Sequence, residues 1–388
     1  MTSSATASRG PFDDPLPAMD VAGRATRLRR RCAASGLDAV LVTDLTNVRW
    51  LTGFTGSAGR AVLTADRLVL VVDGRYGEQA RDQTAEQEVD ADVVVGLSAA
   101  ELYQHVVAAL IGRSAVGFES EHVTVAEHGR LDGHLGSRLR PAAGLVESER
   151  RSKDDGEIAR IERACAIASA ALEAILPLVD AGPTESELAR TLDRAMEDLG
   201  ASGPSFETIL ASGPNAGRPH ARPGGRRIRE GDTVVFDFGA LYDGYHSDMT
   251  RTLLVGEVDP WLRDAYAAVE AAQAAGVAAV RAGRPAAEVD AACRTLLTDA
   301  GFGAHFTHGT GHGVGLLIHE APWVRQGADE RLQVRDVVTV EPGVYRGDLG
   351  GIRIEDTVVV TTDGCRPLTL TPKDLSCLRS PPTTSRPE

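Results

Sequence analysis

The sequence predicts an α/β protein with more than one domain. Its 388 residues exceed the usual size of a single domain, so two or three domains are expected. Short runs of β-branched and aliphatic residues alternate with longer segments whose apolar residues recur every three or four positions. The chain has 41 glycines but only 8 Phe, 3 Trp and 6 Tyr. This composition favours an α/β fold with many tight turns over an aromatic-packed β-sandwich.

The first part of the chain predicts a tail followed by a small domain. Residues 1–20 are rich in Ser, Thr, Ala, Pro and Asp and lack an apolar segment. We therefore expect a disordered tail rather than a signal peptide or an anchor. A first α/β domain is expected over residues 21–148, with strands predicted at 38–43, 60–64, 67–72, 91–95 and 115–118.

The second domain is predicted over residues 153–375 and follows one plan twice. A helix that begins at Lys153-Asp154-Asp155 and a second with a capping-box start at Pro183–Glu187 precede a carboxylate-bearing hairpin. The plan then repeats as two helices, a loop rich in His and Gly, and two more strands. The strands of the first hairpin are predicted at 233–239 and 245–255. In the second half, helices are predicted at 259–281 and 285–301, and strands at 337–341 and 352–361.

Charge and cysteine content exclude several classes of function. The formal net charge is −14, from 41 Lys and Arg against 55 Asp and Glu, so a nucleic-acid partner is not expected. The five cysteines form no C-x-x-C pair, which is typical of reduced thiols in a cytoplasmic protein. No apolar run approaches the length that spans a bilayer, so no membrane partner is expected.

Two aspartates in the first hairpin are candidate metal ligands. If Asp243-Gly244 forms a two-residue turn, Asp237 pairs with Thr250, and Asp237 and Asp248 become diagonal neighbours roughly 7–8 Å apart on one face. Carboxylates that close repel each other unless a proton or cations lie between them. The alternative is a solvated hairpin face, and a three-residue loop would place the two aspartates on opposite faces.

Two glutamates in the second half strengthen the metal hypothesis. Glu341 ends an apolar strand, and alternation places Glu355 on one face with Arg353 and Thr357. Surface charge rarely places four acidic residues in two hairpins of a repeated unit. The companion that we expect for them is a pair of divalent cations.

A histidine-rich segment completes the candidate ligand set. His308 and His312 are separated by glycines that would each cost a helix about 1 kcal/mol, so the segment is expected to be extended with both rings on one face. One imidazole with four carboxylates favours Mn²⁺, with Co²⁺, Fe²⁺ or Zn²⁺ possible. Two such ions suit hydrolysis of an amide bond. No G-x-S-x-G motif is present, and no cysteine lies beside the histidines.

From about Gly23 to Thr371 the sequence resembles the proline-specific metallopeptidases with the pita-bread fold, Xaa-Pro aminopeptidase and Xaa-Pro dipeptidase (prolidase). Residues 47–57 and Asp73-Gly-Arg-Tyr76 look like the N-terminal creatinase-type domain of that family. The resemblance implies a pita-bread catalytic domain preceded by a smaller α/β creatinase-like domain. Methionine aminopeptidases lack an N-terminal domain of this size, and creatinase lacks the metal ligands.

The resemblance also implies a role for each site residue. The metal ligands would be Asp237, Asp248, His312, Glu341 and Glu355. Of these, Asp248 and Glu355 would bridge two divalent ions, and Glu341 would also shuttle a proton. The substrate would contact His220, His308 and His319, the last two supporting the tetrahedral intermediate. Tyr345 and Arg353 match positions that support the ligands from behind.

The expected activity is that of an Xaa-Pro aminopeptidase, which removes the residue before proline from the N-terminus of peptides. The alternative is an Xaa-Pro dipeptidase, whose pocket would need a positive group for the free carboxylate of proline. A non-catalytic pita-bread binding protein is a third interpretation, which retention of all five ligands disfavours. The resemblance further implies proline-containing peptides as substrates and a homodimer.

Overall fold

The computed structural model describes residue 12 and residues 14–375, and these form two compact units. One unit spans Met19–Arg150, and the other begins at Arg151 and includes the described residues before Met19. Most of the predicted disordered tail, residues 1–11 and 13, lies outside the described residues, as does Cys377. The described part of that segment contacts the second unit, where Arg163 donates to Asp14 O (3.0 Å) and Arg160 to Pro17 O (3.1 Å).

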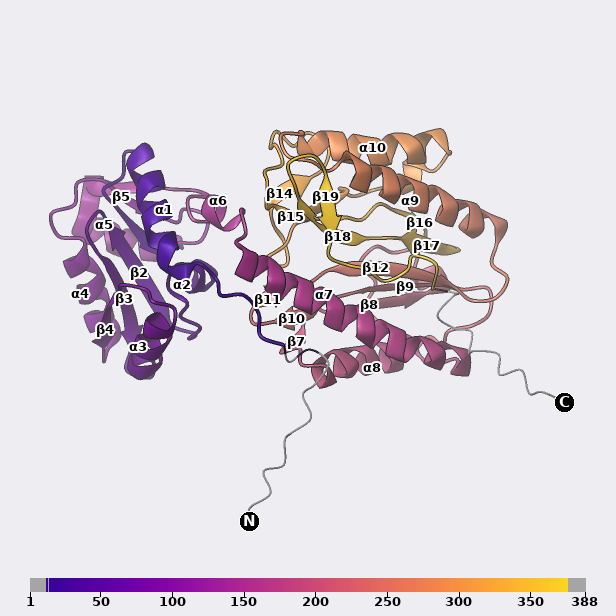
Figure 1. The fold of residues 1–388 in the computed structure, drawn as a ribbon, viewed down its shortest axis with the longest axis horizontal. Helices are drawn as coiled ribbons and strands as arrows, with labels where there is room; N and C mark the ends of the chain where they lie inside the picture. The colour runs from indigo at the N-terminus through magenta and orange to yellow at the C-terminus, as the bar shows by residue number, and fades with distance from the viewer. Residues whose placement is uncertain (1–11, 13, 376–388) are drawn as a thin grey trace, which may run out of the picture. The chain divides into compact units, whose positions relative to one another are not determined.

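The first unit is a six-stranded mixed sheet in the order β4-β3-β2-β1-β5-β6 (Figure 1). Helices α4 and α5 cover the face that carries Leu41, Val62 and Val71, because successive side chains along a strand point to opposite faces of the sheet. The strands are β1 (Ala39–Val42), β2 (Gly59–Thr64), β3 (Leu68–Asp73), β4 (Asp92–Gly96), β5 (Val116–Phe118) and β6 (Leu139–Pro141). The helices are α1 (Val21–Ala34), α2 (Leu45–Thr52), α3 (Gly77–Glu86), α4 (Ala99–Ala109), α5 (Val125–Leu135) and α6 (Glu147–Arg150).

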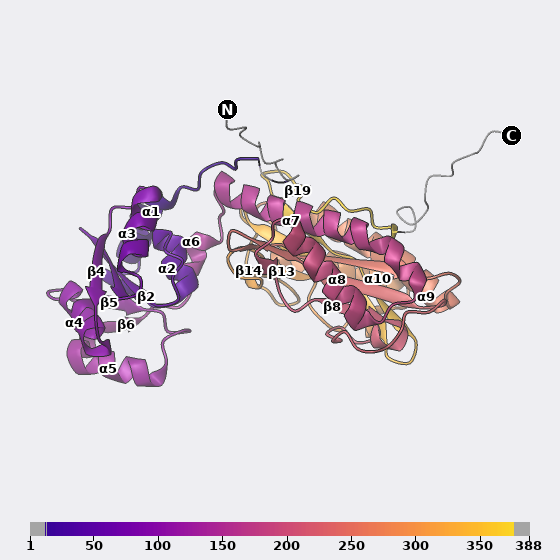
Figure 2. The ribbon, with the colours of Figure 1, turned by 90° about the horizontal axis from the view of Figure 1, so that it is seen from below.

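In the second unit, two pairs of helices cover opposite sides of a set of antiparallel strands (Figures 1 and 2). One side has α7 (Asp155–Ile175) and α8 (Glu185–Asp198), and the other has α9 (Pro260–Ala279) and α10 (Ala286–Asp299). Each pair packs on its own apolar cluster of buried residues. The arrangement of helices and hairpins follows the repeated plan that the sequence predicts.

The strands of the second unit form four sheets. The first half contributes β12-β9-β8 and β11-β10-β7, and the second contributes β14-β13-β15-β18-β19 and β16-β17. First-half strands are β7 (Gly203–Pro204), β8 (Ile209–Ser212), β9 (Thr233–Phe238), β10 (Ala240–Tyr242), β11 (Tyr245–His246) and β12 (Met249–Leu254). Second-half strands are β13 (Gly311–Gly313), β14 (Glu320–Val324), β15 (Val337–Val340), β16 (Gly343–Arg346), β17 (Gly350–Arg353), β18 (Asp356–Val360) and β19 (Cys365–Pro367).

Helix α7 is more apolar than the sequence analysis allowed. The stretch Asp155–Ala181 is long and apolar enough to cross a membrane by length and composition, because an 18-residue window within it has a mean hydropathy of 1.7. Half of that window is buried inside the protein. Ile161, Ala168 and Leu172 are fully buried in it, so its hydrophobicity serves the core of the second unit. A core helix of this kind is weak evidence for a membrane span.

The first hairpin has the predicted register. Tyr242 pairs with Tyr245 and Asp237 with Thr250, and both residues of the Asp243-Gly244 turn have positive φ (45° and 72°). That geometry belongs to a two-residue type I′ turn. The predicted continuous strands are each interrupted, at Gly239 and at Ser247-Asp248. A Cβ at Gly239 would lie 1.8 Å from Ser247 O, so the close approach of the two backbones requires glycine there.

Candidate metal centre

The five predicted ligands come from five separate points in the second unit and line one cavity of about 410 Å³. Asp237 lies in β9, Asp248 directly before β12, His312 in β13, Glu341 directly after β15, and Glu355 between β17 and β18. Three of them therefore occupy breaks in the strand pattern, where the backbone is released from the sheet ladder.

The ligand atoms approach each other closely. One side-chain ligand atom from each of Asp248, His312 and Glu355 lies within 4.8 Å of the other two. The Nε2 of His312 is 3.3 Å from Glu341 Oε1 and 3.6 Å from Asp248 Oδ2. Asp237 contacts the group through Arg353, whose Nη2 donates to its carboxylate. The predicted set thus comes together at a single buried place.

The electrostatics of the cavity match a site that holds cations. Burial, with the neighbouring carboxylates, raises the pKa of Asp248 and Glu355 well above the usual range. Burial also raises the pKa of Asp237, against the opposing charge of Arg353. Burial acts in the same direction on Glu341, but the hydrogen bond and charge of His312 outweigh it and lower the pKa of this carboxyl. Positive charge between these groups would relieve their repulsion.

Two buried oxygens support the fit of a metal. Within the described part of the chain, Asp248 Oδ1 and Glu355 Oε1 are buried without a hydrogen-bond partner. Buried polar atoms are nearly always satisfied, so these two indicate ligand positions for a hard cation. The Nδ1 of His312 lies 3.0 Å from Gly313 O and therefore donates to it, which leaves the Nε2 lone pair directed at the carboxylates.

Arg353 and Tyr345 support the ligands. Arg353 donates to Tyr345 Oη (2.7 Å), to Thr250 Oγ1 (3.1 Å) and to Asp237. Thr250 in turn donates to Glu355 Oε2 at 2.8 Å. Burial raises the pKa of Tyr345 to about 12, so its hydroxyl stays protonated. This network links a ligand of the first hairpin to a ligand of the second.

The three predicted substrate-side histidines also line the cavity. His308 Nδ1 lies 2.7 Å from Gly309 O, and its Nε2 lies 2.9 Å from Tyr345 Oη. The rings of His319 and His312 are 4.3 Å apart in an edge-to-face arrangement. Burial lowers the pKa of both His308 and His319, which keeps them neutral near pH 7. His220 is exposed at the rim of the cavity.

Four further lining residues were missed by the sequence analysis: Phe206, Ile209, Trp323 and Arg325. Ile209 pairs with Asp237 across β8 and β9, but its strand lies in a segment that carried no strand prediction. Trp323 and Arg325 lie at the end of β14, and their only signal was that they follow His319 closely. Trp323 is 39% exposed, and Arg325 stacks over its ring at 5.6 Å.

Comparison with known proteins decides the family. The sequence pattern of metallopeptidase family M24 matches residues 159–362, more than half of the chain. The chain belongs to metallopeptidase family M24. The pattern of the creatinase/prolidase N-terminal domain matches residues 24–152. The predicted resemblance, the metallopeptidase class and the predicted fold class are therefore confirmed.

Individual relatives of this M24 chain cover nearly all of it. The uncharacterized peptidase YqhT of Bacillus subtilis (strain 168) is 38% identical over 353 residues, which cover 91% of this chain and 99% of YqhT. A solved Xaa-Pro dipeptidase from Bacillus anthracis has 37% identity and a TM-score of 0.87, and the match covers 91% of this chain and 99% of that structure's chain. A solved X-Pro aminopeptidase from Thermotoga maritima MSB8 has 32% identity and a TM-score of 0.81, and the match covers 90% of this chain and 99% of that structure's chain.

Proposed function

We propose that this M24 chain is a dinuclear-metal exopeptidase that hydrolyses the peptide bond preceding proline. The observation that carries the proposal is the convergence of Asp237, Asp248, His312, Glu341 and Glu355 on one buried cavity that contains two unsatisfied carboxylate oxygens. The family and the names of the relatives support the same chemistry. Residues 153–375 would form the catalytic domain, and residues 21–148 the creatinase-type domain.

The donor set favours two Mn²⁺ ions, because four carboxylates and one imidazole are a hard, oxygen-rich environment; Co²⁺, Fe²⁺ or Zn²⁺ are the other candidates. When bound, such ions polarise a carbonyl and lower the pKa of water. Asp248 and Glu355, together with Asp237 and His312, would hold these ions, as the family resemblance implies.

The remaining residues would bind substrate and move protons. Glu341 stays ionised beside His312, so its carboxylate is available to accept a proton from water. His308 and His319 would contact the substrate as neutral rings, and His220 would contact it from the rim. Arg353 and Tyr345 would hold Asp237 and His308 in place. Proline lacks an amide hydrogen, so its recognition must come from the shape of the pocket.

The substrate is proposed to be a peptide with proline in the second position, as in an Xaa-Pro aminopeptidase. One observation favours the second candidate, an Xaa-Pro dipeptidase. Arg325 lines the cavity, and among the described residues its side chain forms no ion pair and contacts the ring of Trp323. A guanidinium in that position suits the free carboxylate of a dipeptide.

The test compares Gly-Pro and Ala-Pro with a matched Ala-Pro-Yaa tripeptide, using protein loaded with Mn²⁺. Cleavage of the tripeptide supports the aminopeptidase, whereas cleavage of the dipeptides alone excludes it. If Arg325 binds the carboxylate, Arg325→Gln raises KM for dipeptides and leaves KM for the tripeptide unchanged. Arg366→Gln, an exposed arginine paired with Glu162, is the control. No hydrolysis with Mn²⁺, Co²⁺ or Zn²⁺ would leave the non-catalytic binding protein.

We also propose a homodimer that resides in the cytoplasm. The homodimer is implied by the resemblance to the pita-bread peptidases. The cytoplasm is supported by the cysteines, because Cys32, Cys165, Cys293 and Cys365 are all free thiols. Sedimentation of the full chain tests the dimer, and fractionation of the source cells tests the location.

A further inference from the structure

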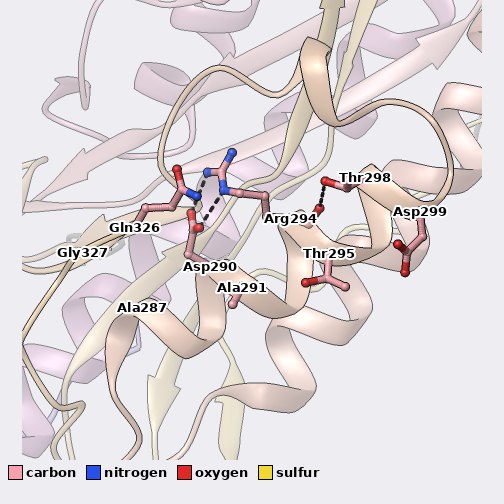
Figure 3. A pocket seen from close by; sticks show the side chains of 9 residues that line it. All are labelled: Ala287, Asp290, Ala291, Arg294, Thr295, Thr298, Asp299, Gln326 and Gly327. Carbon is pink, nitrogen blue, oxygen red and sulfur yellow. Dashed lines mark hydrogen bonds and ion pairs between the residues drawn. The ribbon is translucent and has the colours of Figure 1, made fainter.

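Helix α10 carries an ion pair that faces the histidine-rich loop. Arg294 donates from Nε to Asp290 Oδ2 (2.8 Å) and from Nη2 to Asp290 Oδ1 (2.9 Å). Asp290 is fully buried, and the side chain of Arg294 is 18% exposed. Figure 3 shows the two side chains pointing toward each other from one helix, at the wall of a cavity. This cavity of about 500 Å³ shares no lining residue with the candidate metal centre.

The remaining donors of Arg294 bind the loop on both sides of residue 307. Its Nη2 donates to His308 O at 2.8 Å, and its Nη1 donates to Phe306 O at 3.2 Å. The guanidinium also lies over the Phe306 ring, 4.1 Å from its centroid. The Phe306 ring packs edge-to-face on the His308 imidazole, with centroids 5.1 Å apart. Arg294 thus contacts the backbone of His308 directly and its ring through Phe306.

Asp290 extends the same contact toward a metal ligand. Thr310 Oγ1 donates to Asp290 Oδ1 at 2.9 Å, and Thr310 is fully buried. The carbonyl of Thr310 accepts from the backbone N–H of Glu341 at 2.7 Å. The ion pair therefore restrains His308 and Thr310, the residues on either side of Gly309. Through the carbonyl of Thr310 it also restrains the backbone of Glu341.

The chemistry of this ion pair suits it to fixing the position of neighbouring groups rather than to stabilising the core. Desolvation of two charges offsets much of their attraction, so a buried ion pair contributes little net stability compared with apolar packing. A planar guanidinium, in contrast, donates in several fixed directions at once, which is what two carbonyls and a carboxylate require. The ammonium group of lysine has no such planar arrangement of donors.

We infer that Asp290 and Arg294 are positioning residues that hold His308 and Glu341 in place at the substrate cavity. The inference rests on the proposed function for what His308 and Glu341 do, but the restraint on the loop does not depend on it. Misplacement of a catalytic group by about 1 Å costs on the order of 10²-fold in rate.

The first measurement is amide hydrogen exchange without substrate, comparing the wild type, Arg294→Gln and Arg294→Lys. The Thr310 amide donates to Val324 O at 2.8 Å, so its exchange reports opening of the loop. We expect faster exchange over residues 306–310 in Arg294→Gln, and an intermediate effect in Arg294→Lys, which keeps a cation beside Asp290. Glu288→Gln is the control, because Glu288 is exposed in the first turn of the same helix and pairs with Arg284, which precedes the helix.

The second measurement is a double-mutant cycle on Xaa-Pro hydrolysis. We expect Arg294→Gln to lower kcat/KM by about tenfold or more with unchanged metal content. The loss should be much smaller in a His308→Ala background, because the restraint acts largely through that residue. An equal loss in both backgrounds overturns the inference, and so does full activity in Arg294→Lys.

The two proposals fail separately. If the wild type does not hydrolyse Xaa-Pro peptides, the proposed function fails and the exchange experiment still decides the role of the ion pair. If the wild type is active but exchange over residues 306–310 is unchanged in Arg294→Gln, the positioning role fails and the proposed function stands.

Discussion

Asp248 and Glu355 each have one buried oxygen without a hydrogen-bond partner among the described residues. Asp248→Asn keeps the shape of the side chain and removes its charge. Changing a residue that only orients a metal ligand costs about 10–100-fold in metal affinity, so loss of the proposed ligand Asp248 should cost at least as much. We expect metal content and hydrolysis to fall together while the circular dichroism spectrum is retained. An active Asp248→Asn protein with normal metal content would refute the assignment.

Tyr345 tests the support network behind the ligands. Tyr345→Phe removes the hydroxyl that accepts from Arg353 and contacts His308. We expect kcat/KM to fall about 10–100-fold, because Arg353 and His308 lose a shared partner. Two bound metal ions per chain should remain. Unchanged kinetics would show that the hydroxyl has no part in positioning His308.

Single residues differed in how well the sequence revealed them. All five predicted ligands and the three predicted histidines line one cavity. The sequence revealed the carboxylates because charged residues in apolar strands are unusual, whereas the roles of the three histidines came from the family resemblance. Tyr345 lies behind the cavity, in contact with His308. Ile209, Trp323 and Arg325 could not be seen, because apolar residues and an exposed arginine have many ordinary uses. Their role depends on which strands come together, and one sequence does not contain that information.

The hairpin of β9 and β12 depends on a glycine where its strands break. Gly239→Ala would place a methyl group against Ser247 O and force apart the segments that bear Asp237 and Asp248. We expect the protein to lose about 1–3 kcal/mol of stability or more, measured by urea unfolding, together with metal binding. Gly347→Ala, at an exposed position with no atom within 4 Å of its Cβ, is the matched control and should change stability by less than about 0.5 kcal/mol. Equal stability of the two variants would contradict this account of the hairpin.

Elements were predicted well where local chemistry decides them. The Asp-Gly turn set the register of the first hairpin, α7 begins at the predicted Asp154-Asp155, and the predicted capping box at Thr184 begins α8. The breaks at Gly239 and Glu355 were not predicted. The N–H of Glu355 donates to Thr250 O, a partner 105 residues away, so a distant strand determines where this one ends.

For the whole molecule, the excess of acidic residues arises partly from the candidate metal centre. Four of the carboxylates behind the net charge of −14 lie in the candidate metal centre. Because they are concentrated in one cavity, we expect the stability of the protein to depend on metal and pH together.

Metal removal should therefore destabilise the protein more as pH rises. The folded-state pKa values of Asp248 and Glu355 are raised, so without metal their contribution is favourable at low pH and is lost as pH rises through those values. Bound cations compensate the ionised form. We expect the Tm difference between metal-loaded and chelator-treated protein to grow from about pH 5 to about pH 8. An Asp248→Asn, Glu355→Gln double variant should show a small and constant difference, and a constant difference in the wild type would contradict the assignment.

We propose that one cavity of this protein binds two divalent ions and that peptides are cleaved there before proline. The experiment titrates Mn²⁺ into metal-free protein while metal binding and hydrolysis of Ala-Pro and Ala-Pro-Yaa are measured in the same sample. We predict that two equivalents bind per chain and that cleavage before proline rises with occupancy. Full occupancy without cleavage of either peptide, or cleavage that is independent of bound metal, would contradict it.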